Sequence, residues 1–335
     1  MYPLFNYWIP NFTAANPSII VNPGSTGSGT GQSQAEHGLV QIGASDPYLN
    51  AAQSTQYPWI LNIPLAISAQ QVNYNVPGIP ATMHLNFSGT LLSEIYNGTI
   101  TYWDNQAIKA ANPAATCLLP HLLIKPTYRT DSSGDTSIFT QYLSASDAWW
   151  NKTVGFGTTV HWPSNPADTT GTGNSGMLTT CQNTPGCVAY IGISYLTKAN
   201  NAGLGYGYLK NQAGNYVDIS ATNIQSAVNS VPSVPTNEKI SLIYTPGMDS
   251  YPIVNFEYAM VAVNQTSSSV VTALHTFLSW AISPTEGNSA YFLNKVNFVP
   301  LPSSVMTLSQ NQINMISTAA YTATTSATST ASGSS

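Results

Sequence analysis

The chain has 335 residues, of which 43% are hydrophobic, enough for two lobes of ordinary domain size rather than a single core. Charged residues make up only 6% of the chain, and an aromatic content of 10% argues against intrinsic disorder. The net charge is −5 and the eight lysine and arginine residues are not clustered, which excludes a nucleic-acid-binding protein. No apolar run is long enough to predict a membrane span. Residues 1–12, MYPLFNYWIPNF, have no basic region and contain prolines, so we expect no signal peptide there.

Strands alternate with helices along the chain, a pattern typical of α/β lobes with mainly parallel sheets. Short β-branched runs predict strands at 19–24 and 40–46, and a helix can begin between them after Gly31. The later elements, in chain order, are helices at 91–96 and 104–111, a strand at 122–128, a helix at 136–143, strands at 187–193, 240–244 and 254–263, and a helix at 270–282. From Ser317 to Ser335 the chain is almost wholly Ser, Thr and Ala, which predicts a disordered tail.

The only arginine of the chain, Arg129, stands just after the predicted strand at 122–128. The residues that follow it, DSSGDT, lie where the strand gives way to a helix. Free backbone N–H groups and the helix dipole bind anions at such a position. Gly134 allows close approach of a ligand, the Ser133 hydroxyl donates, and Arg129 adds a planar fork that matches an oxyanion. The alternative is an ordinary helix cap, because Ser and Asp are common capping residues.

Two earlier segments end at similar turns. The sequence NPGSTGSGTGQSQ (22–34) is either a ligand-facing turn or a flexible linker. Asp46 follows a predicted strand and precedes Pro47, so it is either a ligand-binding carboxylate or a helix cap.

Cys181 and Cys187 lie six residues apart with Pro185-Gly186 between them, which suits either a short disulfide loop or two buried thiols. Cys117 has no evident partner. No histidine lies at metal-ligand spacing, and no nucleophile-elbow motif is present in a strand–turn–helix context. We therefore predict no metal, no cofactor and no catalytic residue.

Three motifs belong together: a glycine-serine turn at 27–29, the sequence GASD at 43–46, and an Arg-x-Asp-x-Ser-Gly loop at 129–134. The stretch YNGTITYWDNQAIKAANP (96–113) contains a Tyr-x-Gly-x-Ile-x-x-Trp-Asp pattern. In these motifs, and over about residues 2–310, the chain resembles the phosphate-specific substrate-binding proteins of bacterial and archaeal ABC transporters.

The resemblance implies an α/β, two-lobed periplasmic-binding-protein fold of type II. Each lobe is expected to be a mixed, mainly parallel sheet flanked by helices, and two crossovers form the hinge. One lobe would combine residues 1–77 with 246–316, the other would span 78–245, and the tail would cover 317–335.

The resemblance also implies a phosphate site between the lobes, whose predicted contacts are Tyr2, Ser28, Asp46, Arg129, Ser133, Gly134 and Asp135. Gly27 and Asp131 would support it, with Asp131 orienting Arg129. Asp46 can only accept hydrogen bonds when ionised, so it would favour a protonated phosphate oxygen and repel sulfate.

Two positions depart from the family pattern. Met1-Tyr2 stands where the family has a glycine-rich first strand and a Thr-Phe pair, so we expect an altered first strand, with Tyr2 replacing the aromatic residue. Asp135 stands where a threonine is common. It either accepts a hydrogen bond from a second phosphate hydroxyl, favouring dihydrogen phosphate, or caps the helix.

The implied function is capture of inorganic phosphate outside the cytoplasm, in the periplasm or at the cell surface, and delivery to the membrane subunits of an ABC permease. We expect a monomer that is not an enzyme. The alternatives are a receptor for another tetrahedral oxyanion, and a secreted phosphatase-like hydrolase or an adhesin built on the same fold.

Overall fold

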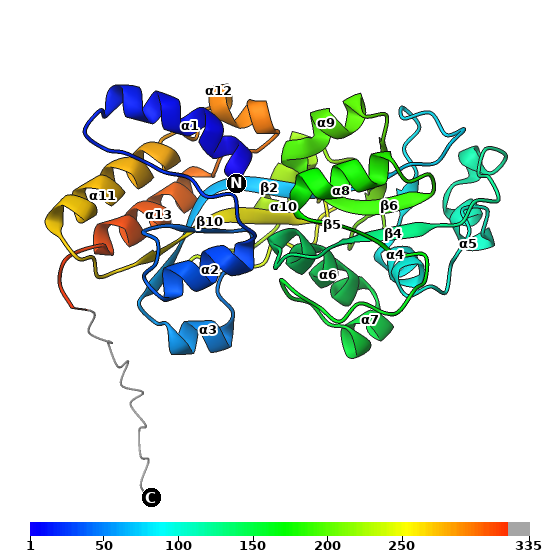
Figure 1. Ribbon diagram of the computed structural model, residues 1–335, viewed down its shortest axis with the longest axis horizontal. Helices are drawn as coiled ribbons and strands as arrows, with labels where there is room; N and C mark the ends of the chain where they lie inside the picture. Colours follow the sequence, from blue (N-terminus) through cyan, green and yellow to red (C-terminus); the bar gives the residue numbers. More distant parts are fainter. Residues whose placement is uncertain (321–335) are drawn as a thin grey trace, which may run out of the picture.

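The computed structural model describes residues 1–320, which form two lobes lying side by side along the long axis of the molecule (Figure 1). The helices of the first lobe are α1 (Tyr2–Ala15), α2 (Ser28–Glu36), α3 (Ala51–Gln56), α11 (Ser268–Ile282), α12 (Ala290–Leu293) and α13 (Ser303–Met315). Those of the second lobe are α4 (Gly89–Tyr96), α5 (Gln106–Ala111), α6 (Gly134–Ser146), α7 (Ala148–Thr153), α8 (Gly173–Gln182) and α9 (Leu196–Asn201). Within residues 1–320 no helix has both the length and the apolar character needed to cross a membrane.

The lobes share a mixed sheet with the strand order β1-β10-β2-β6-β4-β5, and β7 pairs with the end of β2. Its strands are β1 (Gly43–Ser45), β2 (Ile60–Tyr74), β4 (Lys125–Arg129), β5 (Thr169–Gly171), β6 (Cys187–Gly192), β7 (Gly205–Tyr206) and β10 (Val254–Ala262). A small second sheet, in the order β3-β8-β9, consists of β3 (Asn86–Phe87), β8 (Tyr208–Lys210) and β9 (Tyr216–Val217). Single 3₁₀ turns lie at η1 (Pro113–Ala115), η2 (Ile193–Tyr195) and η3 (Asn294–Val296).

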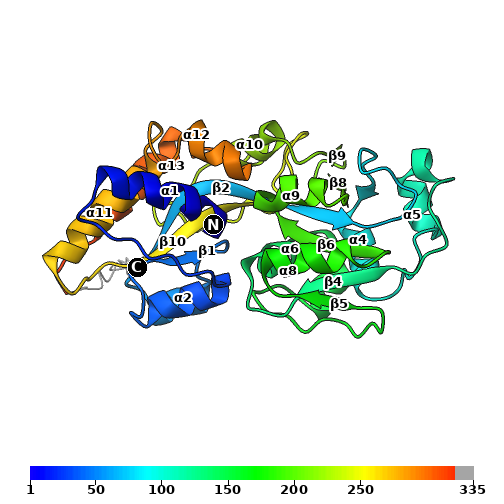
Figure 2. The same cartoon turned by 45° about the horizontal axis from the view of Figure 1, so that its top comes forward.

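The long strand β2 runs from one lobe into the other (Figure 2). It pairs antiparallel with β10 as far as Ala69, and from Gln70 it pairs antiparallel with β6. Opposite Pro64, which has no N–H to give to the ladder, the register with β10 shifts between Glu257 and Tyr258. α10 (Ala221–Asn229) is tied to the segment before β10 by the hydrogen bond from Tyr251 N to Asn223 O, 3.0 Å.

The predicted α/β class and the two-lobed architecture of mixed sheets flanked by helices are confirmed. The expectation of mainly parallel pairing is wrong in one respect. Parallel pairs join β4 to β5 and to β6, and β3 to β8, whereas the remaining pairs are antiparallel. The reason is that the long strand β2 runs antiparallel to β10 over its first part and antiparallel to β6 over its second.

Most of the elements expected from sequence patterns are present, including the helices at 91–96, 136–143 and 270–282. Two predicted strands are not. Residues 19–24 are extended but pair with no strand, and Ile20 is 79% exposed. Residues 240–244 end in a turn at Tyr244, whose φ is +55°, so the chain reverses where a strand would continue. The strand β2 was missed, because all 15 of its residues are buried and no alternation marks it.

Instead of a first strand, the chain opens with α1, whose buried face is Leu4, Trp8 and Phe12. This i, i+4, i+8 stripe packs against α11. The rings of Phe12 and Phe277 pack edge-to-face, with their centroids 5.0 Å apart. The indole nitrogen of Trp8 donates to Gly287 O at 2.8 Å, so the polar atom of this buried ring is satisfied.

A disulfide joins Cys181, near the end of α8, to Cys187, the first residue of β6, with Cα atoms 5.3 Å apart. Cys117 is exposed and unpaired among the described residues. The predicted tail starts at Ser317, which is still held in the fold because its N–H donates to Val263 O at 2.8 Å. The rest of that prediction, 321–335, lies outside the described residues.

Candidate functional site

A cavity of about 430 Å³ lies between the lobes. Every contact and supporting residue that the sequence motifs suggested lines it: Tyr2, Gly27, Ser28, Asp46, Arg129, Asp131, Ser133, Gly134 and Asp135. These residues come from five separate parts of the fold, so the folded chain brings together motifs that are up to about 130 positions apart in the sequence.

The loop after Arg129 has the predicted strand-to-helix geometry. β4 ends at Arg129 and α6 begins at Gly134. Ser133 is the N-cap of α6, and its Oγ accepts a hydrogen bond from Thr136 N at 3.3 Å. Only Thr136 N is satisfied in this way, so the amides of Gly134 and Asp135 have no partner within the helix, and both residues line the cavity.

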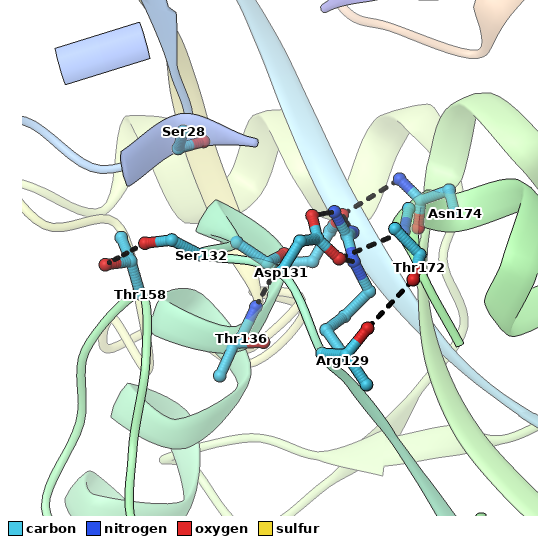
Figure 3. Close-up of polar contacts among 12 residues, drawn as sticks. Ser28, Arg129, Asp131, Ser132, Thr136, Thr158, Thr172 and Asn174 are labelled. Carbon is cyan, nitrogen blue, oxygen red and sulfur yellow. Dashed lines mark hydrogen bonds and ion pairs between the residues drawn. The ribbon is translucent and has the colours of Figure 1, made fainter. Parts of the chain in front are cut away.

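Arg129 is buried and fixed by Asp131 (Figure 3). Its Nε donates to Asp131 Oδ1 at 2.7 Å, and its Nη2 is ion-paired with Asp131 Oδ2. The N–H of Gly173 also donates to Asp131 Oδ1, at 3.0 Å. Burial alone would raise the pKa of Asp131, but these hydrogen bonds outweigh it and hold the pKa below its ordinary value. The position of Asp131 is therefore the one expected of a residue that orients Arg129.

Asp135 faces Arg129 from the first turn of α6. Its Oδ2 accepts from Arg129 Nη1 at 2.9 Å and from Asn174 Nδ2 at 2.8 Å, and its Oδ1 accepts from Gln70 Nε2 at 3.2 Å. Because Ser133 is the cap, the capping alternative for Asp135 is wrong. Burial and the charge of Asp46 raise the pKa of Asp135, and Arg129 opposes them. Its contact with a phosphate hydroxyl stays a prediction.

Ser28 and Asp46 enter the cavity from the first lobe. α2 begins at Ser28, earlier than the start predicted after Gly31, so the glycine-serine turn is the helix N-terminus itself. Ser28 Oγ donates to Asp46 Oδ2 at 3.1 Å and lies 3.1 Å from Asp46 N, which donates to it. The next helix, α3, is capped by Asn50, so Asp46 is not a cap. Burial, reinforced by nearby Glu257, raises the pKa of Asp46 to about 7.

The two lobes touch at this point. Gly29 N donates to Ser132 O across the gap at 3.2 Å. A Cβ on Gly27 would lie 2.2 Å from Ser132 O, and one on Gly134 would lie 1.9 Å from Asp46 Oδ2. The Gly27 contact is with backbone, so glycine is required there for the lobes to meet as they do. A Cβ on Gly134 would displace the Asp46 carboxyl group.

Three helix N-termini meet at the cavity: those of α2, α6 and α8. The N-caps of α2 and α8, Gly27 and Thr172, make no side-chain capping bond. The first-turn amides of these helices are therefore not satisfied by a cap, and the dipoles of all three present partial positive charge. Together with Arg129 this arrangement has the features that suit an oxyanion: N–H groups and helix dipoles with little formal charge.

Several cavity residues were not anticipated as site residues. Asn174, in the first turn of α8, donates to Asp135 and accepts from Gly192 N at 3.0 Å. Glu257, which lines the cavity, belongs to β10. Gln70 is not a lining residue, but it donates to Asp135 from the missed strand β2. The predicted contact Tyr2, the first residue of α1, lines the cavity while remaining 38% exposed. Within residues 1–320, no group of three or more His, Cys, Asp or Glu side chains is placed to hold a metal ion.

Comparison with known proteins identifies the family of this chain. A family model described as a PBP superfamily domain matches residues 1–285. The phosphate-binding protein PstS of Methanocaldococcus jannaschii is 32% identical over 326 residues, covering 92% of this chain and 82% of the relative. PstS of Xylella fastidiosa (strain 9a5c) is 29% identical over 308 residues, covering 91% and 80%.

Among solved structures, a high-affinity periplasmic phosphate-binding protein (PfluDING) bound with phosphate matches with a TM-score of 0.67 and 20% identity, over 84% of each chain. At that identity the match concerns the fold alone. The family match and the relative from M. jannaschii are sufficient to classify the chain: it belongs to the PBP superfamily and, within it, to the family of PstS phosphate-binding proteins.

Proposed function

We propose that this protein binds inorganic phosphate in the cavity between its lobes. The observation that carries the proposal is the convergence of three helix N-termini, the fixed Arg129 and the carboxyl group of Asp46 on one cavity. The amides and Arg129 suit the ionised oxygens of a tetrahedral anion. The predicted contacts remain Tyr2, Ser28, Asp46, Arg129, Ser133, Gly134 and Asp135.

Asp46 supplies the discrimination between oxyanions. An ionised carboxyl group accepts hydrogen bonds and cannot donate them, so it pairs with an oxygen that carries a proton. Phosphate keeps a proton near neutral pH and sulfate does not. Sulfate would place an unprotonated oxygen against Asp46, and that contact is repulsive in a buried cavity.

The wider role follows from the family. The protein would act outside the cytoplasm as a monomer, close its lobes on phosphate, and deliver it to the membrane subunits of an ABC permease. We place the lobes at 1–77 with 246–316 and at 78–245, and expect the hinge where β2 and the return to β10 cross. The proposed role is binding without catalysis, without a cofactor and without nucleic acid.

Calorimetric titration with phosphate and with sulfate tests this proposal. We expect phosphate to bind and sulfate to bind at least about a hundredfold more weakly, a difference of about 2.7 kcal/mol. Arg129→Ala should abolish phosphate binding, because it also leaves Asp131 and Asp135 without their cation. Asp46→Asn should reduce the preference for phosphate over sulfate.

Matched controls are Lys152→Ala and Asp249→Asn, which change charge at exposed positions and should bind as the wild type does. Equal binding of both anions, or of neither, would contradict the proposal. Turnover of a phosphomonoester by the same preparation would instead indicate a hydrolase.

A further inference from the structure

The loop that follows β4 is attached at both ends to one buried tyrosine, Tyr190 of β6. Arg129 and Thr136 mark the two ends of this loop in Figure 3. The N–H of Arg129, where β4 ends, donates to the Tyr190 hydroxyl at 3.0 Å. The hydroxyl of Thr136, in the first turn of α6, lies 2.7 Å from the same oxygen and is hydrogen-bonded to it. One hydroxyl group therefore links the end of the strand to the start of the helix, with residues 130–135 between its two contacts.

The Tyr190 hydroxyl stands where the backbone pairing between β4 and β6 has ended. The parallel register of the two strands stops at Thr127 and Ala189, two positions before Arg129. The N–H of Arg129 is directed to the tyrosine oxygen instead of to a carbonyl group of β6. A buried backbone N–H without an acceptor is costly, so this bond allows β4 to leave the sheet and turn toward the cavity.

Tight packing fixes the position of this hydroxyl. Tyr190 is 0% exposed, and its ring stacks on Phe139 of α6 with the ring centroids 4.5 Å apart. The ring of Trp162 stacks with it as well, at 6.0 Å between centroids. Burial raises the pKa of Tyr190, so its hydroxyl keeps its proton and can donate as well as accept. Because the packed ring cannot follow a moving loop, the two hydrogen bonds tie the loop to a fixed point of the sheet.

We propose that Tyr190 is a positioning residue for phosphate, whose hydroxyl fixes Arg129 and the free amides of Gly134 and Asp135 in the geometry that receives the anion. The inference rests on the proposed phosphate function. Tyr190 does not line the cavity, so it acts on the ligand only through the loop. Arg129 is ion-paired with Asp131 and Asp135, which both lie between the two contacts. A shift at either end of the loop therefore changes the direction of the guanidinium group.

Tyr190→Phe tests this role, because it removes the hydroxyl and keeps the ring. The change leaves the Arg129 N–H and the Thr136 hydroxyl without a partner in a buried place. The loop can relieve that cost only by moving, which disturbs the groups that it carries. We expect calorimetric titration at pH 7 to show a phosphate affinity lowered by about tenfold.

Tyr96→Phe is the matched control. Tyr96 is 1% exposed, and its ring centroid lies 6.4 Å from that of Tyr190. Its hydroxyl donates to Thr127 O of β4 at 3.1 Å and to Val188 O of β6 at 3.3 Å, so it joins the same two strands without touching the loop. Both variants should melt at a lower temperature than the wild type, because each loses a buried hydrogen bond. Only Tyr190→Phe should lose phosphate affinity.

Thr136→Val tests the same contact from the helix side, and it replaces Tyr190→Phe if that variant does not fold. It should also lower the phosphate affinity, and Thr136→Ser, which restores the hydroxyl, should recover most of the loss. In the Tyr190→Phe background Thr136→Val should have little further effect, because the bond is already absent.

Three results would overturn the positioning role: wild-type affinity in Tyr190→Phe, an equal loss of affinity in Tyr96→Phe, or losses in the double variant that simply add. Failure of the wild-type protein to bind phosphate would instead refute the proposed function.

Discussion

Arg129 shows how a single cation can be positioned in a protein with few charges. Of the five N–H groups of its guanidinium, three are occupied: one each on Nε and Nη2 by Asp131, and one on Nη1 by Asp135. Two remain for a ligand, one on each terminal nitrogen. The arginine therefore contributes direction more than net charge, because two carboxylates already balance it. Any group that positions these carboxylates acts on the ligand through Arg129.

Asn174 is such a positioning residue, and Asn174→Asp tests it. The change keeps the shape of the side chain but replaces the donor to Asp135 Oδ2 with a second carboxylate. Like charges at this distance repel by several kcal/mol in a buried site. We therefore expect the phosphate affinity at pH 7 to fall by about tenfold or more, with partial recovery at pH 5 as a carboxyl group becomes protonated.

The recovery in acid separates repulsion from simple loss of structure, which acid would not repair. Asn151→Asp serves as the control, because it adds the same charge at an exposed position in α7. It should bind phosphate as the wild type does at both pH values. Equal affinities of Asn174→Asp and wild type at pH 7 would show that Asn174 does not act on the site.

The N-termini of α2 and α6 meet across the cavity, and their glycines make the meeting possible. Gly27→Ala tests this contact. Gly27 has φ of −74°, which alanine adopts freely, but its Cβ would lie 2.2 Å from the backbone oxygen Ser132 O in the other lobe. We expect each lobe to fold normally and the closed arrangement to be prevented, with phosphate affinity reduced by about tenfold or more, since both lobes supply contacts.

Calorimetry gives the affinity, and small-angle scattering with saturating phosphate shows whether the variant stays more open than the wild type. Gly24→Ala is the matched control, three residues earlier in the same segment, where an added Cβ has nothing within 4 Å. It should bind and close normally. A Gly27→Ala protein that closes on phosphate like the wild type would show that the lobes can meet in another way.

The extent to which sequence predicts this site depends on the type of element. The β4–loop–α6 unit was predictable, because an apolar run, a Ser-Gly turn and a helical pattern each mark their own part. Gln70 was not, because β2 is buried on both faces and shows no alternation. Glu257 was not, since its direction depends on a register shift opposite a proline about 190 positions away. Local chemistry is visible in the sequence, whereas long-range register is not.

The same limit explains the two strands that were predicted and are absent. A β-branched run such as 19–24 has the intrinsic preference for a strand, but no neighbouring backbone edge pairs with it in residues 1–320. The run at 240–244 ends in a left-handed residue, Tyr244, which turns the chain back toward β10. Strand formation needs a partner as well as a preference.

Several acidic groups of this charge-poor molecule bind a proton more tightly than a free carboxyl group does. Burial raises the pKa of Asp168 to about 6, of Asp46 to about 7 and of Glu238 to about 8. Glu238 is fully buried, and it accepts from Ser309 Oγ at 2.9 Å and from Gln312 Nε2 at 2.6 Å. These bonds hold the segment before β10 against α13. Acidification brings little charge repulsion, because the chain has only eight Lys and Arg and five His.

The sign of the pH effect follows from these shifts. Each of the three groups binds its proton more tightly in the folded protein than in the unfolded chain, where carboxyl groups titrate near about pH 4. Between about pH 4 and about pH 8 the folded protein therefore holds more protons, and its free energy of unfolding falls as the pH rises. Asp131, whose pKa is lowered, has the opposite effect, because its ionised form stabilises the folded protein. That stabilisation is lost only in stronger acid, as Asp131 becomes protonated.

The ligand-free protein should accordingly be more stable at pH 5 than at pH 8. One pKa unit corresponds to about 1.4 kcal/mol. Glu238 alone therefore accounts for a few kcal/mol of the difference in unfolding free energy between pH 5 and pH 8. With about 2–4 °C per kcal/mol for domains of this size, the melting temperature should be at least about 5 °C higher at pH 5. Calorimetric melting at both pH values measures the difference.

Glu238→Gln imitates the protonated group and should reduce the difference in melting temperature markedly, whereas Glu286→Gln, at an exposed position, should leave it unchanged. A wild-type protein that melts higher at pH 8, or a pH dependence that Glu238→Gln leaves intact, would show that buried carboxyl groups do not control the stability of this fold.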